Sequence, residues 1–130
     1  MKKIVWWSIP FVLLTACSNN VAQEIYPEND VPEIVQVLNE NKSINGYKSI
    51  TDKNDVIVAI DIRRMSRFSK DKIEKKIKKQ LEEKFPEKEV LVTGDLKIRW
   101  EVEKIIKENM QTDKLKKSID QIKSLSKEAT

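Results

Sequence analysis

The chain has 130 residues and contains no histidine and only one cysteine. Without histidine, a serine or cysteine nucleophile has no imidazole base, which excludes a serine–histidine site and leaves only a serine–lysine pair open on composition. One cysteine cannot form a disulfide within the chain, and any metal site would have only oxygen ligands. Residues 52–55 resemble a turn and lack EF-hand spacing. The sequence therefore predicts no cofactor, no metal site and no enzymatic activity.

The chain also lacks a hydrophobic segment of transmembrane length near its N-terminus. The apolar run at residues 4–14 is about half as long as a transmembrane helix, which needs ~20 residues. Lys2 and Lys3 precede this run, and small residues follow it. A positive start, a short apolar centre and a small-residue exit are typical of a secretory signal peptide, which we expect at residues 1–16.

The tetrapeptide LTAC at residues 14–17 resembles the lipobox of bacterial lipoproteins. In that motif the cysteine thiol receives a diacylglycerol and the leader is cut in front of it. The resemblance implies that Cys17 is lipidated and holds the protein on the extracytoplasmic face of the cell membrane. The alternative is an ordinary signal peptide with a chance cysteine.

Strong net charge is absent as well. The 25 basic and 21 acidic residues include the two leader lysines, so the chain from residue 17 onward is close to neutral and shows no sign of binding nucleic acid. The charges are unevenly placed. Residues 18–40 hold five acids and no base, and residues 63–88 hold eleven bases against five acids. With its prolines and polar residues, the stretch at 17–43 is predicted to be an acidic flexible tether, in which residues 32–38 could form a helical turn or two.

Regular structure is expected over residues 44–130. An alternating segment at 47–51 and an apolar, β-branched run at 56–62 predict a hairpin whose second strand is central. Ile73, Ile77, Leu81 and Phe85 recur every four residues and predict a helix with one apolar face. A strand at 89–93 and two further helices follow, the first capped by Asp95. The predicted fold is α/β, a small two-layer sandwich in the order β-β-α-β-α-α, with a short mixed sheet and its helices on one face.

Residues 56–103 and the C-terminus resemble the YhcN/YlaJ family of sporulation lipoproteins, with the C-terminus closest to the YlaJ branch. The motifs that carry the resemblance are VAIDI at 58–62, RF at 67–68, KIEKKIK at 72–78, FP at 85–86, VLVTGDLKI at 90–98 and IKSLSKEAT at 122–130. Family members often have Ser-Thr-Asp where this chain has Thr93-Gly94-Asp95. Glycine favours a tight turn there, and Asp95 retains the cap.

The resemblance implies a membrane-anchored, non-enzymatic lipoprotein of an endospore-forming bacterium. It implies action through protein interaction, with a spore-envelope partner, in spore assembly or germination, and it implies no catalytic residues. The alternative function is electrostatic binding of anionic membrane or cell-wall polymer through the lysine-rich helix. A third hypothesis is a muralytic pair formed by Asp61 with Glu101 or Glu103.

The candidate contact surface is basic. Three guanidiniums within five residues, next to Phe68 and just before a helix, are suited to hold an anion or a partner. The competing interpretation is that these arginines pair with neighbouring glutamates while Phe68 packs into the core. The candidate residues are Arg63, Arg64, Arg67, Lys72, Lys76 and Lys79.

Overall fold

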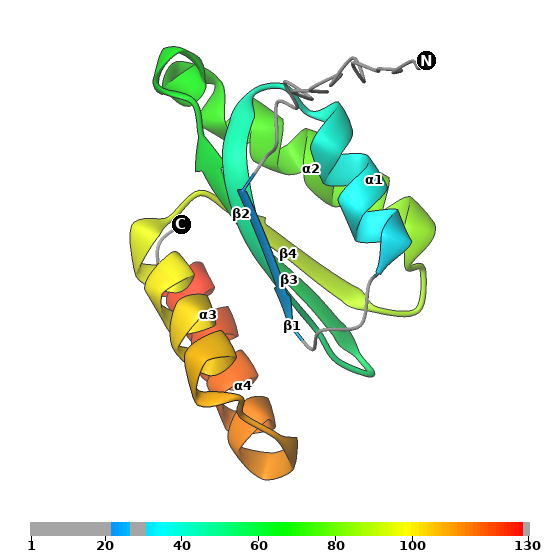
Figure 1. The fold of residues 1–130 in the computed structure, drawn as a ribbon, viewed down its shortest axis with the longest axis vertical. Helices are drawn as coiled ribbons and strands as arrows, with labels where there is room; N and C mark the ends of the chain where they lie inside the picture. The colour runs from blue at the N-terminus through cyan, green and yellow to red at the C-terminus, as the bar shows by residue number, and fades with distance from the viewer. Residues whose placement is uncertain (1–21, 27–30, 129–130) are drawn as a thin grey trace, which may run out of the picture.

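The apolar run predicted as a central strand forms β3 (Asp55–Ile62), which lies inside a four-stranded sheet (Figure 1). The computed structural model describes residues 22–26 and 31–128. The other elements are β1 (Ala22–Tyr26), α1 (Pro32–Glu40), β2 (Ile44–Thr51), the 3-10 helix η1 (Arg64–Ser69), α2 (Lys70–Lys84), β4 (Glu89–Thr93), α3 (Leu96–Glu108) and α4 (Thr112–Glu128). The predicted signal peptide and Cys17 lie outside the described residues.

The strands follow one another in the sheet in the order β1-β2-β3-β4. β2 and β3 form the predicted antiparallel hairpin, β3 and β4 are parallel and joined through α2, and β1 is parallel to β2. The buried residues of α2 are Ile73, Ile77 and Leu81, as the four-residue spacing predicts. The prediction of a small α/β domain with a mixed sheet is confirmed.

The helices cover both faces of the sheet, so the prediction of a two-layer sandwich with helices on one face is wrong, and the domain has three layers (Figure 1). α1 and α2 pack on one side, and α3 and α4 pack on the other (Figure 1). β3 explains the difference, because its side chains alternate between two cores. Val58 and Ile60 belong to the core under α1 and α2, whereas Ile57 and Ala59 belong to the core under α3 and α4. A strand that is apolar at nearly every position is typical of burial on both faces.

The prediction of a flexible tether at residues 17–43 is wrong for the part of that stretch that the structure describes. β1 adds a strand to the sheet, and α1 contributes Ile34, Val37 and Leu38 to the core. Their spacing of three and four residues makes one helix face apolar, and Pro32 begins the helix where a missing amide costs nothing. The observed element order is therefore β-α-β-β-α-β-α-α, with a short 3-10 helix before α2, and the domain does not begin at residue 44.

Buried polar atoms hold both added elements in place. The side-chain amide of Asn41, just past α1, donates to Val37 O at 2.6 Å and to Gln80 Oε1 on α2 at 3.2 Å. The hydroxyl of Tyr26, at the end of β1, donates to the carbonyl oxygen of Met110 between α3 and α4. α1 is thus bonded to α2, and β1 to the helices of the opposite layer.

The strand directions give the sheet two distinct ends. β1 and β2 begin where β3 and β4 finish, since Ala22 is opposite Gly46, Gly46 opposite Asp61 and Thr93 opposite Ala59. We call this the η1 end, because η1 follows β3 there. The other is the hairpin end, which holds the turn between β2 and β3. α2 runs from the η1 end to the hairpin end, where β4 begins (Figure 1).

The turn from β4 into α3 is short and closely packed. The carboxylate of Asp95 accepts a hydrogen bond from Lys97 N at 2.9 Å, which confirms the predicted cap. The backbone of Gly94 does not have a positive φ, so the glycine is not needed for conformational freedom. A Cβ atom there would lie 3.1 Å from Ile62 Cδ1, so the glycine makes room for the end of β3.

Candidate functional site

The predicted contact loop projects from the η1 end of the sheet. We call residues 63–68 the arginine loop; it consists of Arg63 and most of η1. Met65 is 83 % exposed and Phe68 is 89 % exposed. The interpretation that Phe68 packs into the core is therefore wrong. Burying a phenylalanine stabilises a protein by roughly 1.5–3 kcal/mol, so the fold forgoes this gain at Phe68.

The arginines of the loop are available for contact. Arg63, Arg64 and Arg67 are exposed, and none forms an ion pair with an acid in the described part of the chain. The loop backbone is nevertheless held, since Arg63 N donates to Ser43 O and Ser66 N donates to Arg63 O, each at 2.8 Å. The loop thus presents three cations and two apolar side chains from a defined backbone.

The three candidate lysines continue this surface along α2. Lys72, Lys76 and Lys79 are exposed, and their spacing of four and three residues places them on one side of the helix. The buried residues of α2 lie on its other side. Because α2 runs toward the hairpin end, Lys72 is near the arginine loop and Lys79 is two turns further away. The three lysines therefore form one basic strip along α2, and the end of this strip at Lys72 is the one nearest the arginine loop.

A small pocket opens on the other side of the sheet, also toward the η1 end. It has a volume of about 210 Å³ and is lined by residues of β1, β2, β3 and α3. Gly46 is paired with Asp61 and Ala59 with Lys48, so Gly46 and Ala59 are diagonal neighbours two residues apart in the β2–β3 register, and both have little or no side chain. Few side-chain atoms cover the sheet at this point, and this leaves space for the pocket. Charged side chains, among them Lys48 and Arg99, form the rim.

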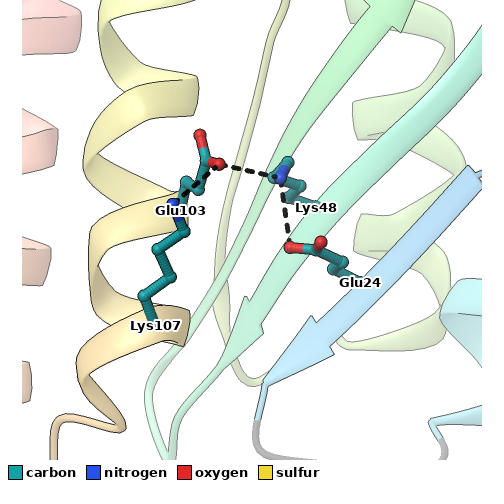
Figure 2. Close-up of polar contacts among 4 residues, drawn as sticks. All are labelled: Glu24, Lys48, Glu103 and Lys107. Carbon is teal, nitrogen blue, oxygen red and sulfur yellow. Dashed lines mark hydrogen bonds and ion pairs between the residues drawn. The ribbon is translucent and has the colours of Figure 1, made fainter.

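Ion pairs cross this rim and join three elements. Lys48 Nζ lies 3.1 Å from Glu24 Oε2 on β1 and 3.7 Å from Glu103 Oε1 on α3 (Figure 2). Lys107 Nζ lies 3.7 Å from the same Glu103 oxygen (Figure 2). Since Lys48 is on β2, it connects both the first strand and the third helix to the middle of the sheet. The arrangement supports a structural role for these charges.

The carboxylate of Asp61 also forms an ion pair. Its Oδ1 lies 3.2 Å from Arg99 Nη2, and the same guanidinium nitrogen donates to Ile60 O at 3.2 Å. Asp61 and Glu103 are thus held by different cations, and no feature of their geometry directs the two carboxylates at one substrate bond. The pocket volume is also below the roughly 300–1,000 Å³ of typical small-molecule sites. The muralytic hypothesis finds no support in this geometry.

Residues 22–26 and 31–128 contain no cluster of three acidic or cysteine side chains placed to hold a metal ion. Within the same residues, no helix is long and apolar enough to span a bilayer. Among the features that the described residues offer for function are the arginine loop, the lysines of α2 and the small charged pocket.

Sequence reasoning missed two aspects of these features. The pairing of Glu24 with Lys48 depends on the register of β1 against β2, and nothing in a five-residue strand indicates that register. The exposure of Met65 and Phe68 was equally hidden, because apolar residues next to a helix start are expected to be buried. The arginine cluster itself was a sufficient signal for the loop.

No family model, no curated protein and no solved structure matches the chain. The resemblance to the YhcN/YlaJ family therefore rests on the sequence motifs alone.

Proposed function

We propose that the protein is a lipoprotein held on the extracytoplasmic face of the cell membrane by a lipid on Cys17, and that it acts by binding rather than catalysis. The lipobox at residues 14–17 supports the anchor, and the resemblance to sporulation lipoproteins supports a role in spore assembly or germination. The partner is a spore-envelope protein. No cofactor takes part.

The arginine loop is the observation that carries the binding role. Exposed aromatic residues and arginines are enriched where proteins bind partners, and here they project from a held backbone. Opposite charge on a partner would speed the encounter more than it would raise the affinity. The fold needs neither Phe68 nor the three arginines for its core. Binding is the role that explains their exposure.

The second candidate function is electrostatic binding of anionic lipid or wall polymer through α2. It is favoured by the exposure of Lys72, Lys76 and Lys79 on one side of the helix. Each lysine near an anionic surface contributes about 1 kcal/mol. High salt separates the two functions, because it screens the lysine contacts of α2 and spares the apolar contacts that Met65 and Phe68 offer in the arginine loop.

The anchor is tested by the intact mass of protein extracted from membranes. We expect cleavage before Cys17 and an added lipid mass, both absent from Cys17→Ala. An unmodified soluble chain from the wild type, at the level seen for Cys17→Ala, would contradict the proposal.

The binding role is tested in spores with Arg63, Arg64 and Arg67 all changed to Glu. We expect germination to be impaired although the domain is folded and lipidated. The matched control changes three exposed lysines elsewhere, Lys53, Lys114 and Lys116, to Glu. Normal germination in the arginine variant would remove the loop from the binding surface. Release of muropeptides from spore cortex by the purified protein would overturn the non-enzymatic role.

A further inference from the structure

The position of β1 determines which end of the domain faces the anchor. Cys17 precedes Ala22 by five residues, which span at most about 18 Å when fully extended. Ala22 is paired with Gly46 at the η1 end of the sheet. A lipid on Cys17 therefore keeps this end, and not the hairpin end, close to the bilayer. This step rests on the anchor proposed above.

The arginine loop lies at the same end. β1, β2 and β3 are neighbours in the sheet, so the start of β1 and the end of β3 are two strand spacings apart, roughly 10 Å. The loop follows β3 directly and projects beyond the sheet (Figure 1). The anchor and the loop are consequently side by side rather than at opposite ends of the molecule.

The exposed apolar side chains are concentrated toward this end as well. Among the described residues, the exposed large hydrophobic side chains are Met65, Phe68, Leu96 and Trp100. The first two are in the arginine loop, and the other two are in the first two turns of α3, which starts where β4 finishes at the η1 end. The hairpin end has none of them. Exposed apolar side chains at the anchored end, two of them in the same loop as three arginines, match the chemistry of a headgroup layer.

We propose that the arginine loop docks into the headgroup region of the anionic bilayer that holds the anchor, so that lipid, and not the spore-envelope partner, is the ligand of the loop itself. Met65 and Phe68 enter the interface, and Arg63, Arg64 and Arg67 contact lipid phosphates. The two acyl chains of a diacylglycerol already hold a protein on the bilayer, so the loop determines how the domain is oriented there rather than whether it is attached. In this orientation α2 leads away from the membrane, so Lys76 and Lys79 are further from the lipid than Lys72 and are left for other contacts.

The experiment uses a fluorescent probe in the full-length lipidated protein. Lipidation consumes the thiol of Cys17, so a cysteine introduced by Phe68→Cys is the one free thiol for an environment-sensitive bimane. The matched control is Asn54→Cys, an exposed position in the hairpin turn at the opposite end. Both proteins are reconstituted into phosphatidylcholine vesicles with phosphatidylglycerol, with and without brominated acyl chains.

We expect the probe at position 68 to shift to the blue and to lose emission when the acyl chains are brominated. The probe at position 54 is expected to show neither effect. Changing Arg63, Arg64 and Arg67 to Glu should restore most of the emission at position 68 while the anchor still holds the protein on the vesicles. Met65→Cys gives the same readout at a second exposed site.

The two proposals fail in different ways. Lipidated protein that floats with the vesicles but shows no quenching at position 68 overturns the docking of the loop and leaves the anchor intact. A water-exposed probe at position 68 that becomes buried only when a spore-envelope protein is added assigns the loop to that partner instead. Protein without a lipid by intact mass refutes the anchor, and the docking falls with it.

Discussion

Lys123 Nζ lies 2.5 Å from Oδ1 of Asp55, which joins the last helix to the start of the central strand. The same nitrogen lies 2.9 Å from Glu89 Oε2. Asp55 and Glu89 are direct neighbours in the parallel pairing of β3 with β4. Two carboxylates in such positions repel each other, and Lys123 compensates both charges at once.

Replacing Lys123 by methionine removes this compensation and leaves the largely buried Asp55 without its cation. We expect Lys123→Met to lower the free energy of unfolding by about 1–3 kcal/mol at neutral pH. Lys116→Met, at an exposed position of the same helix, is the control and should change it by less than about 0.5 kcal/mol. Denaturant titration of both variants measures the difference. Equal midpoints would show that the contact contributes nothing.

The same contact predicts a pH dependence. The hydrogen bond and charge of Lys123 hold the pKa of Glu89 below its ordinary 4.5. Burial alone would lower the pKa of Lys123, but the hydrogen bonds and charges of Asp55 and Glu89 outweigh it and raise that pKa above 10.5. A carboxylate whose pKa is lowered by folding stabilises the protein at pH values above its pKa in the unfolded chain. This stabilisation is lost as the pH falls through the pKa that the carboxylate has in the folded protein. A lysine whose pKa is raised by folding stabilises the protein at pH values below its pKa in the unfolded chain. This stabilisation is lost as the pH rises through the pKa that the lysine has in the folded protein.

The stability difference between the wild type and Lys123→Met should therefore be constant between about pH 5 and 10 and should narrow on either side. Thermal unfolding across the pH range measures it. A difference that grows as the pH falls below 4.5 would contradict the assignment of the shift at Glu89 to Lys123.

The apolar face of α2 predicts a sharp contrast between neighbouring residues. Leu81 is fully buried under the sheet, whereas Lys79 is exposed. We expect Leu81→Ala to cost about 2–5 kcal/mol of unfolding free energy, which is a large share of the stability of a small domain. Lys79→Ala should cost less than about 0.5 kcal/mol. Similar unfolding midpoints for the two variants would mean that this face is not the core face.

The same test applied to α1 shows whether the N-terminal helix is part of the domain. Leu38 is fully buried, and Gln36 on the same helix is exposed. Leu38→Ala is expected to destabilise the whole domain by about 2–5 kcal/mol in one cooperative transition. Gln36→Ala is expected to have little effect. If Leu38→Ala leaves the unfolding curve unchanged, residues 32–40 are a tether after all.

Elements with a strong pattern were predictable from the sequence. The β-branched run of β3 and the four-residue spacing in α2 each indicate one structure only, and Asp95 marks the start of α3. β1 and α1 were not predictable as parts of the fold. β1 has five residues, and α1 has nine within a stretch whose acids and prolines are typical of disorder. Their burial depends on long-range packing against β2 and α2.

Gly94 is a second case in which the sequence does not show why a residue is needed. The sequence indicates a glycine at a turn, for which conformational freedom is the usual reason. The backbone there is ordinary, and the actual reason is the proximity of Ile62, which is 32 positions earlier in the chain. In the arginine loop, the positive charge was predictable from the sequence, but the exposure of the apolar side chains was not. The three arginines are visible in the sequence, but only the fold shows that Phe68 projects away from both cores.

The order of the strands also has a consequence for how the chain acquires its structure. Strands follow one another across the sheet as they do along the chain, so each new strand pairs with the one made just before it. In a chain that emerges with its N-terminus first, the antiparallel pair of β2 and β3 is the most local and can form first. The two parallel pairs form more slowly, because α1 separates β1 from β2 and α2 separates β3 from β4. α4 is the last element along the chain, so the second face is fully covered, and Lys123 reaches Asp55, only when the whole chain is present.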